Sequence, residues 1–363
     1  MSAKREPEGG IGRSMDEATS EALAREGLNP NMVETWEDGY RTADQPDAFE
    51  WWYFDSQFDD GSNMAVVFST KAIRNAKGPL SPTVSLSFKP RDGKGQGFSS
   101  SCGPEEFKAS TRGCDLRVGK NRVKGDLRRY DLRVDADGLK ADLVVTGQAP
   151  PWRPGSGVTY FDYRMTRYFA SVVAVPYGTV EGTITRGGKP QQVTGTVYHD
   201  HYWGNSTMGN LVDQWYWGRA HVGEFSLIFV ELVGIRVLGF GGAKGHVFYL
   251  ARGGEVLTDD GLPLTLVMND FKKGPGGHTY PEKLDFEWHS EEGDVQIALR
   301  RPRLVETVDV LAGPTKLVRP LIYLYRSPFY YYGFDSELEL KVDLSGVRAR
   351  EHGRATFEKM MFS

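Results

Sequence analysis

The sequence predicts an all-β protein made of two antiparallel β domains, and three observations favour this fold class. Aromatic residues make up 12% of the chain and glycine accounts for 43 of its 363 residues, a composition typical of short strands joined by tight turns. Apolar segments of strand length recur along the chain, with turn signals between them. Long helical periodicity is nearly absent after residue 35, which disfavours helical and mixed folds.

The charge balance bears on the class of partner. The chain carries 44 Lys+Arg against 48 Asp+Glu, a formal net charge of −4, and no block of basic residues. Nucleic acid is therefore excluded as an expected partner. Hydrophobic residues at 39% and charged residues at 25% are ordinary for a chain that folds around a sizeable core.

The terminal and apolar segments bear on localisation. The start, Met1–Glu8, has no apolar stretch typical of a secretory signal. The longest apolar candidate, Phe225–Val233, is interrupted by Glu231 and has the length of a strand, well short of the ~20 residues of a spanning helix. We expect a cytoplasmic protein and leave peripheral membrane contact open. The two cysteines, Cys102 and Cys114, do not define a redox compartment, and the oligomeric state is not predicted.

The first 35 residues differ in character from the rest. Residues 1–35 are polar and rich in glycine and glutamate, so we expect an arm before the folded part. One helix is predicted over Met15–Glu26, with Ser14 as its N-cap.

From Trp36 onward the segments have strand length and β-branched or aromatic content. In the first half the predicted strands are Asn63–Thr70, Thr83–Lys89, Lys140–Thr146, Phe169–Val175, Glu181–Arg186 and Gln192–Tyr198. The turn signals between them are Asp60-Gly61, Asp92-Gly93, Asp137-Gly138 and Gly187-Gly188. In the second half the predicted strands are Phe225–Val233, His246–Ala251, Leu264–Met268, Leu284–His289, Val295–Leu299 and Leu338–Val342.

Two aromatic segments indicate an internal repeat. Glu50–Asp55 runs through a short turn into the apolar Asn63–Phe68, and Gln214–Arg219 runs through a short turn into the apolar Glu224–Phe229. Chance similarity between hairpins is the alternative, but duplication of one β domain explains both the pattern and its spacing.

The repeat predicts the domain boundaries. The Gly/Asn/Ser-rich stretch Gly204–Asn210 divides a first β domain at 36–205 from a second at 206–363. Closing a sheet into a barrel protects its edges, and a barrel of this size encloses side chains or one small ligand. Because the tryptophans sit at equivalent places in the two repeats, we expect a ligand site along the seam between the domains.

The most distinctive string runs from Tyr198 to Asn205. In a strand, His199 and His201 share one face while Asp200 points to the other. Two imidazoles could bind a metal, but the remaining histidines have no supporting spacing, so we predict no metal. Two interpretations stay open: structural hydrogen bonding by the histidines, and acid–base chemistry by Asp200 beside an imidazole.

Two further carboxylates stand among apolar residues. Glu50 precedes Trp51 and Trp52, whose indole faces could stabilise a developing positive charge, although an aromatic core strand is the alternative. Glu231 lies inside an apolar strand and either faces water or places a charge in the interior, which is costly unless it is used.

The motifs of several enzyme classes are missing. There is no nucleophile elbow, phosphate-binding loop or dinucleotide fingerprint, so we expect no cofactor. The glycine-rich Gly239–Gly245 lies between β segments and is interpreted as a hairpin loop. Neither cysteine has a neighbouring histidine in the sequence to activate it.

Four segments together resemble the hydroxyneurosporene synthase superfamily. This group includes carotenoid 1,2-hydratases, lipocalin-like proteins of unknown activity and fungal lipocalin-like Diels–Alderases. The resemblance covers residues 36–363 in order and is specific for the scaffold more than for the reaction. The segments that carry it are Glu50–Asp55, Tyr198–Asn205, Trp215–Arg219 and Gly353–Met360.

The resemblance implies two tandem lipocalin-like antiparallel β-barrel or sandwich domains with a hydrophobic ligand site at or near their interface. In the hydratase branch, Asp200 would protonate an alkene, His199 or His201 would position it, and aromatic rings would shelter the cation until water captures it. In the cyclase branch, the pocket would fold a polyene into a reactive conformer. A carrier that binds a hydrophobic molecule without turning it over is the third possibility.

The candidate site residues follow from these motifs and from the resemblance. The expected partner is a hydrophobic small molecule, a polyene or isoprenoid first and a polyketide second. The candidate catalytic residues are Asp200, His199, His201 and Glu50. The candidate substrate-binding residues are Trp51, Trp52, Tyr53, Tyr198, Tyr202, Trp203, Trp215, Trp217, Arg219 and Glu231.

Overall fold

The computed structural model describes residues 15–72, 75–136, 138–162, 164–206, 212–234, 242–309 and 330–362. The chain divides into two compact units, one formed by Thr19–Thr207 and the other by Met208–Ser363 with Met1–Ala18. The predicted boundary stretch Gly204–Asn210 lies partly outside the described residues, so the domain limits stay a prediction.

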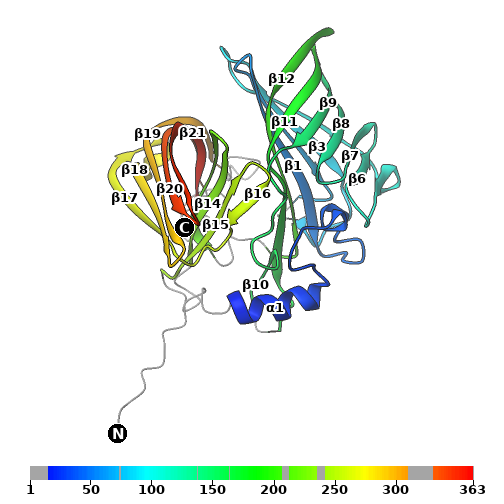
Figure 1. Cartoon of the computed structure of the whole chain (residues 1–363). Coiled ribbons are helices and arrows are strands. Elements are labelled where there is room, and N and C mark those ends of the chain that lie inside the picture. Colours follow the sequence, from blue (N-terminus) through cyan, green and yellow to red (C-terminus); the bar gives the residue numbers. More distant parts are fainter. Residues whose placement is uncertain are drawn as a thin grey trace. The chain divides into compact units, whose positions relative to one another are not determined.

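The first unit contains a 12-stranded antiparallel sheet (Figure 1). The strand order is β4-β3-β2-β1-β12-β11-β9-β8-β7-β6-β5, with β10 paired to β11. Its strands are β1 (Phe49–Phe58), β2 (Asn63–Ser69), β3 (Thr83–Lys89), β4 (Gln96–Ser101), β5 (Phe107–Ala109), β6 (Asp115–Val118), β7 (Asn121–Gly125), β8 (Arg129–Ala136), β9 (Leu139–Gly147), β10 (Val158–Tyr160), β11 (Tyr168–Arg186) and β12 (Lys189–Gly204). The helix α1 (Met15–Glu26), which belongs to this unit from Thr19 onward, and the 3-10 turns η1 (Thr35–Asp38) and η3 (Pro104–Glu106) complete its regular elements.

The second unit contains a nine-stranded antiparallel sheet in the order β16-β15-β14-β13-β21-β20-β19-β18-β17. Its elements are β13 (Val212–Val222), β14 (Phe225–Gly234), β15 (Lys244–Arg252), β16 (Glu255–Thr258), β17 (Leu264–Lys273), the 3-10 turn η6 (Pro275–Gly277), β18 (Thr279–Ser290), β19 (Gly293–Asp309), β20 (Tyr330–Leu344) and β21 (Val347–Met361). The all-β prediction is confirmed.

The two sheets share one arrangement of strands. In each, the opening strand lies between the strand that follows it and the last strand of the unit: β1 between β2 and β12, and β13 between β14 and β21. Trp51 pairs with Ser69 and Tyr202, and Trp215 pairs with Leu232 and Met360. This common topology supports the predicted repeat.

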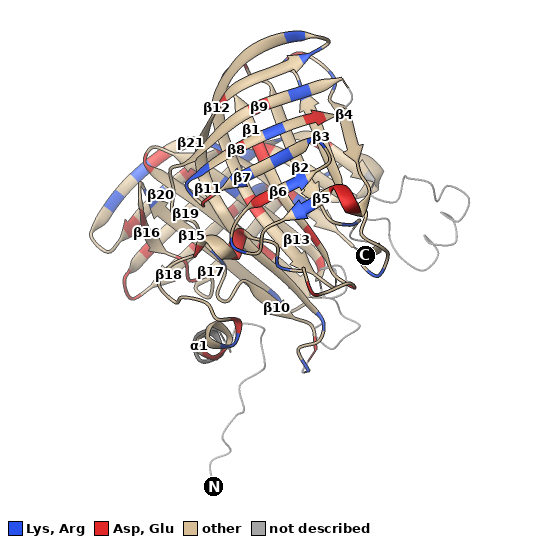
Figure 2. Ribbon diagram, turned by 90° about the vertical axis from the view of Figure 1, so that its right-hand side faces the viewer, with Lys and Arg blue, Asp and Glu red and all other residues tan. Residues whose placement is uncertain are grey.

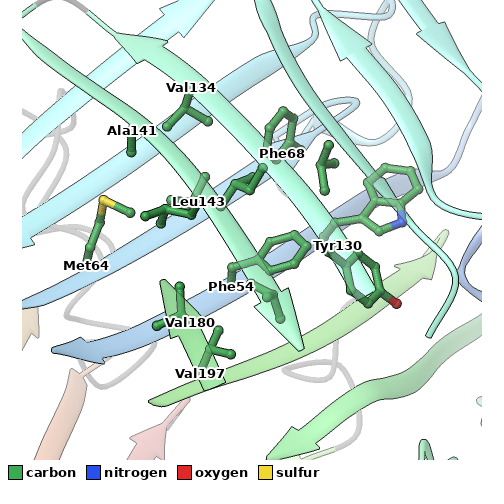
Figure 3. Close-up of a cluster of buried hydrophobic side chains, with 14 of the residues drawn as sticks. Phe54, Met64, Phe68, Tyr130, Val134, Ala141, Leu143, Val180 and Val197 are labelled. Atoms are coloured by element: carbon green, nitrogen blue, oxygen red, sulfur yellow. The ribbon is translucent and has the colours of Figure 1, made fainter. Parts of the chain in front are cut away.

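Each sheet buries alternate side chains on one face, as the two-residue period of a strand requires. In the first unit β3 and β4 approach β8, so the sheet curls over a core that includes Phe54, Phe68 and Tyr130 (Figure 3). The second unit buries a separate core that includes Phe229 and Phe334. We call the core side of each sheet its inner face and the opposite side its outer face.

The outer surface of β6 to β9 carries charges of both signs (Figure 2). Arg133 lies 2.6 Å from Asp142 on the neighbouring strand, and both side chains are exposed. Because exposed pairs contribute about 0–1 kcal/mol each, this surface is a solvated charged face rather than a basic patch.

Several expectations about local structure can be compared with the fold. The helix over Met15–Glu26 is confirmed, while its predicted cap Ser14 lies outside the described residues. The two strands predicted at Phe169–Val175 and Glu181–Arg186 are wrong as separate elements, because β11 runs through both. The Gly187-Gly188 turn is confirmed: both residues have positive φ, 56° and 78°, and join β11 to β12.

The structure also bears on membrane-spanning helices and on the two cysteines. No helix in the described part of the chain is long and apolar enough to cross a bilayer. Cys102 and Cys114 are both free thiols.

Candidate functional site

The string on β12 divides between the two faces of the first sheet. His199 pairs with Phe54 and His201 with Trp52, and these four side chains lie on the inner face. Asp200 pairs with Tyr53 on the outer face. The predicted alternation is therefore confirmed, and it separates the imidazoles from the Asp200 carboxyl by the thickness of the sheet.

The inner face holds a buried network centred on Asp38, at the end of η1. Asp38 Oδ2 accepts a hydrogen bond from the Tyr130 hydroxyl at 2.7 Å and lies 3.2 Å from His199 Nε2. His199 Nδ1 lies 2.9 Å from the Tyr53 carbonyl oxygen. The main chain of Asp38 is tied as well, because Trp52 Nε1 donates to its carbonyl oxygen at 3.0 Å.

Glu50 extends this network. Its Oε1 lies 2.7 Å from His201 Nε2, and it accepts the Arg41 amide at 2.8 Å. Its Oε2 accepts the Thr42 amide and hydroxyl at 2.9 and 2.7 Å. His201 Nδ1 lies 3.4 Å from Asp38 Oδ1, so this imidazole bridges two carboxylates.

Aromatic rings enclose both imidazoles. Trp52 stacks on His201 with centroids 4.3 Å apart, and Phe54 stacks on His199 at 3.8 Å. Both histidine side chains have 0% exposed area, as does Glu50. The geometry therefore favours the structural interpretation of these three residues, which tie η1 to β1 and β12.

The network shifts the pKa values of its members in directions that follow from charge and burial. Burial opposes a charge on His201, but the hydrogen bonds to Asp38 and Glu50 outweigh it and raise the pKa of His201 above 6.5. Burial likewise opposes a charge on Asp38, yet His199 and His201 hold its pKa below the usual value. Burial raises the pKa of Tyr130 well above 10, so its hydroxyl stays a donor.

Asp38, Cys114 and His199 are the group best placed to hold a metal ion in the described part of the chain. Each offers a ligand atom, these atoms lie within 4.8 Å of one another, and all three residues are buried. Burial raises the pKa of the Cys114 thiol well above 9, and the thiol hydrogen-bonds to Asp38. The hydrogen bonds of Asp38 with Tyr130, His199 and Cys114 account for the cluster, which offers three ligands where a structural zinc site has four.

The outer face carries a cluster of aromatic rings near the end of β12, where Tyr202 follows Asp200 by two residues. Trp51 stacks on Tyr202 with centroids 5.3 Å apart, and Phe169 lies 5.3 Å from Tyr202. Phe49 stacks on Trp51 at 5.6 Å. The side chain of Asp200, only 5% exposed, therefore belongs to a largely apolar face.

Strand β11 is irregular beside Asp200. The pairing of β11 with β12 shifts register between Val172, opposite His201, and Val175, opposite His199. Asp200 lies between those two partners. Bulges of this kind re-aim side chains and are frequent next to active sites.

The second sheet also places a carboxyl group near aromatic rings on its outer face. Trp215, Trp217 and Arg219 lie on one face of β13, and the Arg219 guanidinium sits 6.0 Å from the Trp217 ring centroid. Trp215 Nε1 donates a 2.8 Å hydrogen bond to Glu358 Oε1. Burial raises the pKa of the Glu358 carboxyl above 4.5, against the lowering effect of Trp215, Tyr331 and Arg219.

Glu231 lies on the neighbouring strand β14 and is fully buried. Its Oε2 accepts from Lys244 Nζ at 3.0 Å and lies 3.1 Å from His246 Nε2. Of the two positions that the sequence allowed, the structure gives the buried one. The Lys244 ammonium and the hydrogen bond with His246 offset the cost of burying the Glu231 charge.

Asp200 and Glu358 occupy equivalent positions in the two sheets. If Trp51 is matched to Trp215, then Tyr53 matches Trp217. Asp200 pairs with Tyr53 and Glu358 pairs with Trp217, so the last strand of each unit places a carboxyl at the same register.

A cavity of about 300 Å³ opens in the first unit beside the end of β12. Arg41, Arg153, Tyr168 and Trp203 are among the residues that line it. Of the predicted substrate-binding residues, Trp203 alone lines this cavity.

Sequence reasoning missed several residues of these sites. Asp38, Arg41 and Tyr130 have no motif of their own and meet the β12 string only through folding. Arg153 follows Trp152 and carried no signal either. Glu358 did carry a signal, because it lies in the C-terminal segment that supports the family resemblance.

Comparison with known proteins adds information on the fold. No family model matches the chain. The quinolone epoxide rearrangement protein asqO of Emericella nidulans is 24% identical over 213 residues, which cover 51% of this chain and about half (54%) of that protein.

Three solved structures share the architecture over almost the whole chain. A putative AttH from Nitrosomonas europaea matches with a TM-score of 0.61 at 15% identity, covering 93% of this chain and 99% of that one. CghA in complex with Sch210972 matches with 0.58 at 14% identity, covering 92% and 96%. Kievitone hydratase from Nectria haematococca matches with 0.53 at 13% identity, covering 92% and 94%. The predicted lipocalin-like fold is thereby confirmed.

Proposed function

We propose that this protein is an enzyme that transfers protons to and from a small hydrophobic natural product. The observation that carries the proposal is the equivalence of Asp200 and Glu358: each sheet presents a carboxyl group at the same register of an aromatic strand segment, opposite Tyr53 of Trp51–Tyr53 in the first sheet and opposite Trp217 of Trp215–Trp217 in the second. A carboxyl group can donate and accept a proton, and indole faces stabilise a cation that forms beside them.

Hydration of a carbon–carbon double bond is the first candidate reaction. The carboxylic acid donates its proton to one alkene carbon, and a carbocation forms on the other. Water then adds its oxygen to that carbon, and the carboxylate takes the released proton, so that the net change is addition of one water molecule. The name of kievitone hydratase, a structural neighbour, agrees with this reaction class.

Rearrangement or cyclisation is the second candidate reaction. It uses the same first step, protonation of the substrate, but the cation is then captured within the molecule and no water is added. The matched region of asqO, an epoxide rearrangement protein, favours this candidate. A carotenoid is one substrate among the polyenes that the apolar face suits, and a smaller polyketide or terpenoid is another.

A carrier function predicts a different behaviour, because a carrier returns its ligand unchanged. Native mass spectrometry and organic extraction of the purified protein identify what it binds. The protein is then incubated in water enriched in oxygen-18 with that compound, or with a panel of prenylated phenols, terpenoids and polyenes. The products distinguish a hydratase, an isomerase and a carrier. Hydration adds labelled water, isomerisation gives a product of unchanged mass, and a carrier gives no product.

Substitution tests the two carboxyl groups. In Asp200→Asn and Glu358→Gln we expect turnover to fall by about 100-fold or more while substrate affinity stays within a few fold. Asp55→Asn on the outer face of β1 and the exposed Glu337→Gln on β20 make the same chemical change elsewhere and should retain turnover. Equal loss of turnover and affinity would mean that the substituted residue is structural.

A further inference from the structure

The cavity in the first unit is built by elements that lie far apart in the sequence. Tyr160 on β10 donates a 2.7 Å hydrogen bond to Glu26 at the end of α1, and both residues line one side of the cavity. Trp203 and Asn205 at the end of β12 form another side. The volume of about 300 Å³ suits a ligand of the size of one or two fused rings.

Arg41 is the unusual member of this cavity. Its guanidinium sits 4.3 Å from the Trp36 ring centroid and 5.6 Å from the Trp203 ring centroid. Its Nε is buried and has no hydrogen-bond partner among the described residues. The two rings therefore hold a guanidinium in place without using its donors.

The acidic groups nearby are already engaged. Both oxygens of Glu37 accept from Arg153 Nη1, at 2.9 and 3.0 Å. Glu26 accepts a hydrogen bond from the Tyr160 hydroxyl. Glu50 is hydrogen-bonded to His201 and to the main-chain amides of residues 41 and 42. Arg153 also lines the cavity and its Nε is also without a partner among the described residues, but its guanidinium is paired with Glu37, so Arg41 is the arginine left to bind an added anion.

Burial leaves this cation only partly compensated. Removal of Arg41 from water lowers its pKa below its ordinary value, and the attraction of Glu50, Glu37 and Glu26 offsets only part of that effect. An anion hydrogen-bonded to the guanidinium would offset this desolvation.

We propose that the cavity binds a small aromatic carboxylic acid, with its carboxylate on Arg41 and its ring between the side chains of Trp203 and Tyr168. A guanidinium matches the two oxygens of a carboxylate with two parallel donors, a geometry that a point charge does not provide. The ring faces of the cavity supply the apolar contact. This site is separate from the Asp200 face and does not depend on the proposed reaction.

The test uses 2-naphthoate as the acid and 2-naphthamide as its uncharged analogue, titrated into the full-length protein by isothermal calorimetry. We expect one saturable site for 2-naphthoate and binding of the amide that is about tenfold weaker or more. Inorganic phosphate should compete weakly, because it lacks the ring. Equal binding of acid and amide, or the absence of saturable naphthoate binding, would overturn the proposal.

Two variants locate the site. Arg41→Gln keeps the main-chain N–H of residue 41, which donates to Glu50, so the melting temperature of the variant should stay close to that of wild type. Its affinity for naphthoate should fall about tenfold or more. The control is Arg167→Gln, an exposed arginine whose Nε donates to Ser206 Oγ at 3.2 Å and which does not line the cavity. A folded Arg41→Gln that binds naphthoate like wild type would contradict the assignment, as would equal weakening in Arg167→Gln.

Discussion

Asp200 and Glu358 stand at the same register of the two sheets, each opposite the third residue of an aromatic strand segment that begins at Trp51 or Trp215. Both carboxyl groups lie on the outer face, beside rings rather than among the residues of the core. The strands that carry them, β12 and β21, are also topologically equivalent. The internal repeat therefore includes the position of a carboxyl group as well as the order of the strands.

Because folding raises the pKa of Glu358, we expect Glu358→Gln to increase stability at pH 7 although it lowers turnover. A carboxyl whose pKa is raised on folding contributes its stability below the unfolded pKa, near 4.5, and loses it as the pH rises through the folded pKa. Glu358→Gln should therefore be more stable than wild type at pH 7 by roughly 1 kcal/mol, while its turnover falls. Urea unfolding at pH 4 and pH 7 measures this, and lower stability of the variant at pH 7 would contradict it.

His201 predicts how stability changes near neutral pH. Its pKa is raised on folding, so its contribution is fully present below about 6.5 and is lost as the pH rises through the folded pKa. The free energy of unfolding of wild type, taken relative to that of His201→Gln, should fall by about 1 kcal/mol over this window. Urea unfolding from pH 6 to pH 9 gives the comparison. The exposed His352→Gln is the control and should follow the wild-type curve.

The buried pair of Arg153 and Glu37 predicts a strongly non-additive pair of substitutions. Their side chains are 7% and 3% exposed, and Arg153 Nη1 contacts both carboxylate oxygens. Arg153→Met leaves a buried carboxylate without its cation and should cost about 3–5 kcal/mol. The double variant with Glu37→Leu should regain a substantial part of that loss. A double-mutant cycle by urea unfolding measures the coupling, and additive losses would show that the pair is not coupled.

Lys359 predicts a stabilising substitution in the second unit. Burial lowers its pKa to about 8. Its Nζ lies 5.5 Å from the Tyr216 ring centroid and donates to the Thr279 carbonyl oxygen, and no carboxylate in the described ranges is paired with it. The folded protein pays for the charge below pH 8, and this penalty disappears as the pH rises toward 10.5. Lys359→Met should stabilise by about 1–2 kcal/mol at pH 7 and by less at pH 10. Thermal unfolding at both pH values is the measurement, and a gain that is the same at pH 7 and pH 10 would show that the charge is not its cause.

Much of the fold could be predicted because strands leave a local signal. Alternating burial makes β2 and β3 recognisable from their own residues, and the Gly187-Gly188 turn supplies the positive φ that a two-residue hairpin needs. Short strands such as β5 and β10 were missed, since three residues carry too little pattern. The continuity of β11 was missed because its bulges interrupt the alternation.

Local patterns in the chain were enough to predict the all-β class, the paired aromatic strands and the alternation that puts His199 and His201 on one face and Asp200 on the other. The contacts of those side chains depend on how distant segments fold together. Asp38 and Tyr130 reach the imidazoles from distant segments, and Glu358 acquires its partner only when β21 pairs with β13. The physical reason is that face and period are properties of a single strand, whereas hydrogen-bond partners, burial and pKa depend on long-range pairing that no local pattern encodes.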